Sequence, residues 1–171
     1  MDHIRKLTLI GAGFMGLDIA LTVLKNTESE IALYDSSSEA IGKAKSSIET
    51  LSGHNEKLKK ISFHEDLAAA LLDTDLIIEA IPEDLELKRT IFRELDRLAP
   101  PDAILATNSS SFPVSWMEGA AQRPDRMFNI HFYPPIEQRK MVDLMGGTRS
   151  SEENFEKVAA WVRSIGCVPL R

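Results

Sequence analysis

Hydrophobic and polar positions along the chain form two patterns, short apolar runs and longer stretches with helical spacing. Apolar runs bounded by turn residues are typical of buried strands, and apolar residues three or four apart are typical of helices packed on a sheet. The runs predict strands at 7–10, 31–34, 61–63, 76–81, 104–106, 127–132 and 141–145, and an extended segment at 168–170. Helical stretches lie at 17–24, 39–51, 67–72, 83–98 and 113–118, and a last helix starts near 150. This alternation favours an α/β fold with a doubly wound, mostly parallel sheet and helices on both faces.

The spacing also predicts which helical side chains face the sheet. In the helices at 39–51 and 83–98 the expected inward positions are Ile41, Ile48, Leu51, Leu87, Ile91, Leu95 and Leu98. In the last helix they are Phe155, Val158, Ala159, Val162 and Ile165. Ser150 and Glu153 have the spacing of a capping box at its start, and Gly166 ends it.

A glycine-rich turn, IGAGFMG, follows the first predicted strand and opens the first predicted helix. Its Gly-x-Gly-x-x-Gly spacing is that of the Rossmann dinucleotide fingerprint. Gly11 permits the tight turn, Gly13 lets the backbone approach a pyrophosphate, and Gly16 lets the helix pack closely. The helix N-terminus offers N–H groups to the phosphates. The expected cofactor contacts at this turn are Gly11, Gly13, Phe14, Met15 and Gly16.

Asp35 follows the second predicted strand, 19 residues after Gly16. An acidic residue there accepts hydrogen bonds from the adenosine ribose and repels a 2′-phosphate. The serines at 36–38 supply no arginine for such a phosphate, so NAD is favoured over NADP. Two other interpretations stay open: a plain glycine turn with a helix-capping aspartate, and a methyltransferase cofactor site.

Composition narrows the class of protein. The chain has 171 residues and a formal net charge of −6, which argues against nucleic-acid or anionic-membrane partners. Its one cysteine, Cys167, cannot form an internal disulfide, and the sequence has no metal-binding motif. No apolar run approaches the ~18 residues that span a bilayer, and no apolar leader precedes the first strand. We therefore expect a cytoplasmic protein.

Candidate chemistry gathers where predicted strands end. Glu79, Glu83 and Lys88 flank the end of one strand, and the small polar residues 107–111 follow the next. Without further pattern, Glu83 and Lys88 indicate only a helix start and a solvated charge. The histidines at 54 and 64 lie near turns and are expected at the surface.

His131 lies near the end of the strand at 127–132, with Asp143 twelve positions later on the next strand. An imidazole oriented by a carboxylate acts as a general base in proton transfer. Spacing alone favours a core histidine with a backbone partner.

Taken together, these segments make the chain resemble the N-terminal NAD-binding domain of the L-3-hydroxyacyl-CoA dehydrogenase family over nearly its whole length, 1–171. The matching segments are IGAGFMG, Asp35, EAIPEDLELK at 79–88, TNSSS at 107–111, RPDRMFNIHFYPP at 123–135 and MVDLMGGTRSSEE at 141–153. The resemblance implies reversible oxidation of a 3-hydroxyacyl-CoA to a 3-ketoacyl-CoA with NAD, a reaction of fatty acid metabolism.

The resemblance also implies roles for individual residues. Glu83 and Lys88 would contact the nicotinamide half of NAD. Ser110 would hydrogen-bond the substrate's 3-oxygen, and Asn108 would hold its loop beside the cofactor. His131 would be the catalytic base, oriented by Asp143.

The sequence departs from the family pattern in four places. The acidic partner is normally glutamate, one methylene longer than Asp143, and Pro134 replaces the asparagine that usually follows His-Phe-Phe. The stretch 39–63, which corresponds to a longer CoA-handling excursion, is short. Its basic residues, for which a solvated helix face is the preferred interpretation, are Lys43, Lys45, Lys57, Lys59 and Lys60. The family's C-terminal helical domain, which completes the substrate pocket and dimerises, is absent from the sequence.

Two alternatives therefore accompany the acyl-CoA reaction. The shortened region fits a dehydrogenase of a smaller free 3-hydroxy acid, and the missing domain fits a non-catalytic NAD-binding module. As a partner we expect the missing C-terminal domain or a second copy of the chain.

Overall fold

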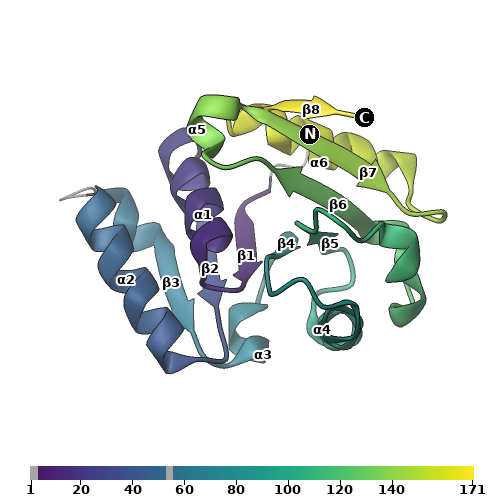
Figure 1. Cartoon of the computed structure of the whole chain (residues 1–171), viewed down its shortest axis with the longest axis horizontal. Helices are drawn as coiled ribbons and strands as arrows, with labels where there is room; N and C mark the ends of the chain where they lie inside the picture. Colours follow the sequence, from purple (N-terminus) through teal and green to yellow (C-terminus); the bar gives the residue numbers. More distant parts are fainter. Residues whose placement is uncertain (1–3, 53–55) are drawn as a thin grey trace.

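The predicted strands come together in one sheet. The computed structural model describes residues 4–52 and 56–171, and in it eight strands pair in the order β3-β2-β1-β4-β5-β6-β7-β8 (Figure 1). They are β1 (Lys6–Ile10), β2 (Glu30–Tyr34), β3 (Ile61–His64), β4 (Leu76–Glu79), β5 (Ile104–Thr107), β6 (Met127–Phe132), β7 (Met141–Gly146) and β8 (Val168–Leu170). Pairing is parallel from β3 through β6, while β7 runs antiparallel to β6 and β8 runs parallel to β7. The expected mostly parallel sheet is confirmed.

Helices cover both faces of this sheet, as the alternation of elements predicts. They are α1 (Phe14–Asn26), α2 (Ser38–Ser52), α3 (Leu67–Ala70), α4 (Leu85–Leu98), α5 (Ile136–Arg139) and α6 (Glu152–Ser164). Short 3₁₀ helices are η1 (Glu56–Lys60), η2 (Val114–Trp116), η3 (Glu118–Ala120) and η4 (Pro124–Arg126). Figure 1 shows α1 and α2 on one side of the strands and α4 on the other. In residues 4–52 and 56–171, none of the helices is long and apolar enough to cross a membrane.

Two apolar clusters fill the space between sheet and helices. Side chains alternate along each strand, so Ile78 packs in the cluster with α1, α2 and α6, whereas Ile77 packs in the cluster with α4. Because β1, β2, β4 and β5 are covered on both faces, nearly all their residues are buried. This explains why the central strands appear in the sequence as continuous apolar runs.

Predicted inward faces are confirmed for α6 and only partly for the other helices. The four expected positions in α6 and the fifth, Ile165 at its C-cap, are all buried, together with Trp161. In α2, Ile41 and Ile48 are buried but Leu51 is 69% exposed, so its inward placement was wrong. Residues 53–55, the predicted break with His54, lie outside the described residues.

The predicted face of α4 was wrong at Leu87, which is 45% exposed. The buried positions of α4 are Lys88, Phe92, Leu95 and Asp96. Lys88 pairs with Glu79, and Asp96 pairs with Arg126 at 2.7 Å. Because these partners compensate the buried charges, a face that contains two charged residues packs against the sheet. The spacing of apolar residues in the sequence cannot identify such a buried face.

Several element boundaries also differ from the prediction. β4 ends at Glu79 and α4 begins at Leu85, since Asp84 caps that helix by accepting a hydrogen bond from the Leu87 N–H. The stretch at 113–118 forms the two 3₁₀ helices η2 and η3 rather than one helix. The cap of α6 is Ser151, not Ser150, whose hydroxyl instead accepts from the Gly147 N–H and donates to the Met127 carbonyl.

The order of the strands in the sheet indicates at which edge a ligand would bind. From β1 the chain winds outward to β2 and β3, then returns to β4 and winds the other way through β5 and β6. Ligands of doubly wound sheets bind outside the carboxyl ends of the strands where this reversal occurs. The glycine turn and the polar residues after β4, β5 and β6 all lie at that edge.

Candidate active site

The glycine turn connects β1 to α1, and its three glycines have different surroundings. Gly11 has a φ of +108°, and a Cβ there would lie 2.7 Å from the Ala80 carbonyl oxygen. A Cβ on Gly16 would lie 2.1 Å from the Gly11 carbonyl oxygen. A Cβ on Gly13 would meet no heavy atom within 4 Å. The fold itself therefore requires glycine at 11 and 16, whereas the space beside Gly13 is open.

The start of α1 is free to receive an anion. Gly13 is its N-cap and supplies no side-chain hydrogen bond, so the first N–H groups of this 13-residue helix have no side-chain cap. Phe14 is 70% exposed, and Met15 lines the neighbouring cleft. A helix N-terminus of this kind favours negative charge.

Asp35 lies directly after β2, beside the same turn. One carboxylate oxygen accepts a hydrogen bond from the Ala12 N–H at 3.0 Å, and the other accepts from the Ser37 N–H at 2.9 Å. These bonds hold the half-buried carboxylate next to the glycine turn. The sequence-predicted turn and acid are thus brought together.

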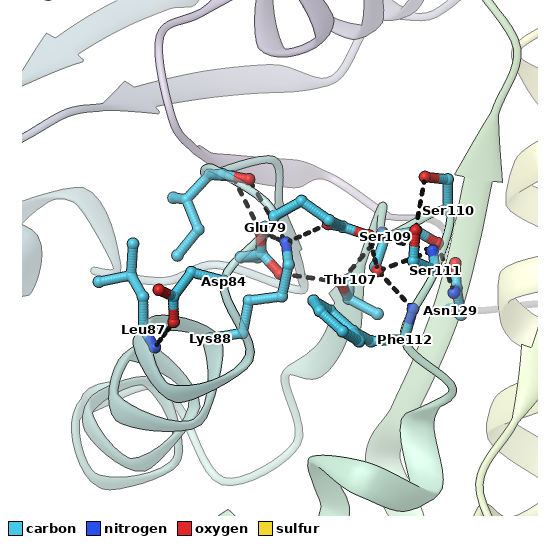
Figure 2. A network of polar contacts seen from close by, with 12 residues as sticks. Glu79, Asp84, Leu87, Lys88, Thr107, Ser109, Ser110, Ser111, Phe112 and Asn129 are labelled. Carbon is cyan, nitrogen blue, oxygen red and sulfur yellow. Dashed lines mark hydrogen bonds and ion pairs between the residues drawn. The ribbon is translucent and has the colours of Figure 1, made fainter.

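A buried polar network follows β4 (Figure 2). Glu79 is fully buried, and its carboxylate accepts from the Lys88 ammonium at 2.7 Å, the Thr107 hydroxyl at 2.8 Å and the Ile81 N–H at 2.8 Å. Lys88 is 1% exposed, so it is no solvated charge. Burial raises the pKa of Glu79, and attraction to Lys88 opposes that shift only in part.

Glu83 links this network to the loop after β5. Its carboxylate lies 3.2 Å from the Lys88 ammonium and accepts hydrogen bonds from the Ser109 hydroxyl and the Ser111 N–H. Partial burial acts to raise the pKa of Glu83, but the Ser109 hydrogen bond and the charge of Lys88 outweigh it and lower the pKa. Glu83 is therefore an anion held at the wall of the site.

Two asparagines join the loop after β5 to β6. The Asn108 side-chain oxygen accepts from the Phe132 N–H at 2.9 Å, and the Asn129 amide donates to the Ser109 carbonyl at 2.9 Å. These bonds place Ser110 at the mouth of the site, where its hydroxyl lies 3.4 Å from that of Ser111. Asn108 thus holds the loop through β6.

These residues surround a cleft of about 350 Å³. Its lining comprises Met15, Ala80, Ile81, Glu83, Lys88, Asn108, Ser110, His131, Phe132 and Pro134. One wall comes from α1 and the opposite wall from the end of β6, so elements far apart in sequence close around one space.

His131 and Asp143 face each other across β6 and β7. The register pairs them directly, and Nδ1 of His131 lies 3.7 Å from Oδ2 of Asp143. That separation is too long for a hydrogen bond. The same carboxylate oxygen instead accepts a short hydrogen bond from the Tyr133 hydroxyl.

Sequence reasoning missed three of these groups: Ser109, Asn129 and Tyr133. Tyr133 had a usable signal, because residues two apart in an extended segment share a face and Tyr133, the first residue after β6, follows His131 by two. Ser109 and Asn129 had no such signal, since their partners lie in loops more than a dozen residues away in the sequence. His64, at the end of β3, contacts Ser62 and is not among the residues that line this cleft.

Comparisons with known proteins agree with this arrangement. The family model described as the NAD-binding domain of 3-hydroxyacyl-CoA dehydrogenase matches residues 6–171. The mitochondrial hydroxyacyl-coenzyme A dehydrogenase of Rattus norvegicus is 30% identical over 184 residues, covering 98% of this chain and 58% of that protein. The 3-hydroxybutyryl-CoA dehydrogenase of Clostridioides difficile is 31% identical over 176 residues, covering 96% and 62%.

Solved structures show the same fold. The structure of a diketoreductase, described as acting on dicarbonyl compounds, superposes with a TM-score of 0.92 at 32% identity. It covers 99% of this chain and 64% of its own. The chain thus spans less than two thirds of the length of these relatives. It belongs to the 3-hydroxyacyl-CoA dehydrogenase family, in which it corresponds to the NAD-binding domain.

Proposed function

We propose that residues 1–171 form one NAD-binding domain of an oxidoreductase that interconverts 3-hydroxyacyl-CoA and 3-ketoacyl-CoA. The observation that carries the proposal is the cleft in which Ser110 and His131 open onto the same space as Met15 beside the glycine turn. A base and a hydroxyl next to a dinucleotide site are the groups that hydride exchange at an alcohol carbon requires. The names of the relatives support the same reaction.

The residues present fit NAD. The open space at Gly13 admits a pyrophosphate that a side chain there would exclude, and the uncapped start of α1 supplies N–H groups. Asp35 would accept hydrogen bonds from the ribose, and Glu83 and Lys88 would contact the nicotinamide half. When bound, NAD supplies the acceptor for the hydride that leaves carbon 3 of the substrate.

The residues of the cleft manage the proton. His131 takes the proton of the substrate's 3-hydroxyl on Nε2 as the C–H bond at carbon 3 breaks. Asp143, beside Nδ1, stabilises the imidazolium that forms, and Ser110 donates a hydrogen bond to the 3-oxygen. In the reverse direction, His131 returns the proton to that oxygen as the ketone is reduced.

A smaller free 3-hydroxy acid is the second candidate substrate. The short stretch expected to handle CoA contains five lysines, and four of them form ion pairs with carboxylates. These pairs are Lys43–Glu39, Lys57–Glu28, Lys59–Glu56 and Lys60–Glu28. Lysines already paired attract CoA phosphates less, which favours a substrate without CoA.

An exposed apolar surface near His131 suggests that another domain or protein covers this part of the chain. On the face of β7 and β8 that carries Asp143, the exposed apolar side chains are Met141, Met145, Val168 and Leu170. Apolar side chains gathered beside a catalytic pair suit an interface. We propose that a C-terminal domain or a second copy of the chain covers this face. A cytoplasmic location stays a prediction from the sequence.

The test is the oxidation of NADH with acetoacetyl-CoA and with free acetoacetate, in the 171-residue chain and in that chain with any natural sequence that follows it. We expect turnover of acetoacetyl-CoA and loss of at least about 100-fold in kcat for His131→Ala. His64→Ala is the matched control, because it removes a histidine outside the cleft.

Each other outcome selects an alternative. Turnover of acetoacetate alone contradicts the CoA assignment and supports the smaller acid. NADH binding without turnover, unchanged by His131→Ala, supports a non-catalytic module. Binding of S-adenosylmethionine without binding of NADH contradicts the dehydrogenase and the NAD-binding module alike.

A further inference from the structure

The surroundings of Asp143 contain a third group besides the histidine. Tyr133 follows His131 by two residues, and the two rings lie 4.5 Å apart between centroids. Asp143 lies opposite His131 on β7. Two strand side chains and the side chain of Tyr133, the first residue after β6, therefore meet beside β6 and β7.

The phenol and the imidazole face the same atom of Asp143. The Tyr133 hydroxyl donates to Oδ2, and Nδ1 of His131 lies 3.7 Å from this oxygen. A carboxylate oxygen has two lone pairs, so it can accept from both groups at once. The contact with Tyr133 therefore leaves a position open for the imidazole.

Asp143 needs such support for two reasons. It is one methylene shorter than the glutamate of the family pattern, and its side chain is 33% exposed. A short, partly exposed carboxylate without a second partner rotates toward water and leaves the imidazole. The hydrogen bond from Tyr133 restricts that rotation.

We propose that Tyr133 is a positioning residue, whose hydroxyl holds the Asp143 carboxylate at the Nδ1 edge of His131. The inference rests on the proposed function in that His131 is the catalytic base. In this role Tyr133 compensates for the shorter side chain of Asp143, because its hydrogen bond holds the carboxylate near the imidazole.

The charge state of Tyr133 suits this role. The hydrogen bond to Asp143 raises the pKa of the phenol, since ionisation would place two anions in contact. The phenol therefore keeps its proton at neutral pH and stays a donor.

The test compares Tyr133→Phe, Asp143→Glu and the double variant in the natural full-length protein. Tyr133→Phe should lower kcat about tenfold and leave KM within about twofold, because the acid–base pair and not substrate binding is affected. In the double variant, the longer glutamate reaches Nδ1 without the phenol, and kcat should return to within about threefold of the parent. Tyr34→Phe, which removes the hydroxyl of the other tyrosine, is the matched control.

A second readout does not depend on turnover. Nitrogen NMR of His131 at mildly alkaline pH reports which ring nitrogen carries the proton. With Asp143 held at Nδ1 the proton resides on Nδ1, and Tyr133→Phe should shift it toward Nε2. An unchanged thermal unfolding midpoint and NADH affinity establish that the variant is folded.

The outcomes separate this inference from the proposed function. A Tyr133→Phe variant with parental kcat and an unchanged tautomer overturns the inference. A parent protein that turns over no substrate, yet shows the tautomer shift, contradicts the proposed function and supports the positioning role. A drop in kcat for Tyr133→Phe that the double variant does not recover also overturns the positioning role of Tyr133.

Discussion

At the glycine turn, residues of one kind do different work. Gly11 and Gly16 face backbone carbonyls so closely that a methyl group cannot fit, while Gly13 faces open space. The first two therefore serve the fold, and Gly13 is the glycine that we propose faces the cofactor. The glycines are identical in the motif, and only their surroundings in the structure distinguish their roles.

This difference predicts opposite results for two alanine variants. Gly13→Ala should fold with stability changed by less than about 1 kcal/mol, since its Cβ meets nothing. Its dissociation constant for NADH should rise at least about tenfold, because the methyl group occupies the phosphate approach. Gly16→Ala should lose about 1–3 kcal/mol of stability through the clash with the Gly11 carbonyl. Urea unfolding and NADH fluorescence titration measure both, and a Gly13→Ala chain with parental NADH affinity contradicts the assignment.

Glu79 and Lys88 illustrate a buried pair that stabilises a site. Lys88 lines the cleft, and Glu79 behind it fixes its ammonium group. Removing one partner would leave the other charge buried without compensation, which is costly. The pair therefore ties the cleft wall to the core.

The raised pKa of Glu79 predicts a pH dependence of stability. Burial, opposed by Lys88, places this pKa above its ordinary value of 4.5, so the folded chain keeps a proton that the unfolded chain releases. The stability from this proton is fully present below pH 4.5 and is lost as the pH rises through the raised pKa. Glu79→Gln should abolish this part of the decline in the free energy of unfolding. Urea unfolding across that window measures the slope, and an unchanged slope in the variant contradicts the raised pKa.

Among the elements, α4 shows how charged residues become part of a core. Its buried face contains Lys88 and Asp96, each paired with a residue from another element. Leu87 lies toward solvent although its spacing predicts the opposite. The orientation of the helix follows the ion pairs and Phe92 rather than the count of leucines.

Two substitutions in α4 test this orientation. Leu87→Gln should change stability by no more than about 0.5 kcal/mol, because the side chain is already exposed. Phe92→Ala should cost about 3–5 kcal/mol, since Phe92 is 1% exposed in the apolar cluster. Both are measured by chemical unfolding of the same chain. A larger loss for Leu87→Gln than for Phe92→Ala would reverse the assigned face.

For the whole molecule, the topology gathers the site. The glycine turn, the loop after β5 and the end of β6 come from three regions of the chain, and parallel pairing brings their strand ends to one edge. The residues proposed to bind the cofactor lie around β1 and β2, and those proposed to handle the proton lie around β6 and β7. NAD binding should therefore stabilise the sheet as a unit.

Thermal unfolding with cofactor tests this coupling. NADH at about 100 times its dissociation constant should add about 2.7 kcal/mol of stability. For a chain of this size, that corresponds to a rise in Tm of about 5–10 °C. NADPH at the same concentration should raise Tm less, because Asp35 repels its 2′-phosphate. Equal shifts with both cofactors contradict the role of Asp35.

By itself the sequence determined where the strands lie along the chain, because buried strands need continuous apolar runs whatever their neighbours. It also determined the dinucleotide turn with Asp35, since a local motif carries its own geometry. The apolar pattern also placed His131 and Asp143 on consecutive strands, and the resemblance supplied their expected roles.

Only the tertiary structure decided which groups touch. The buried face of α4, the hydrogen bonds of Ser109 and Asn129, and the contact between Tyr133 and Asp143 all join different elements. Their energies depend on distances of a few tenths of an ångström and on exclusion of water, which residue spacing does not encode. For this reason the sequence indicated a histidine–aspartate pair, whereas the tertiary structure brought the hydroxyl of Tyr133, directly after β6, onto the Asp143 carboxylate of β7.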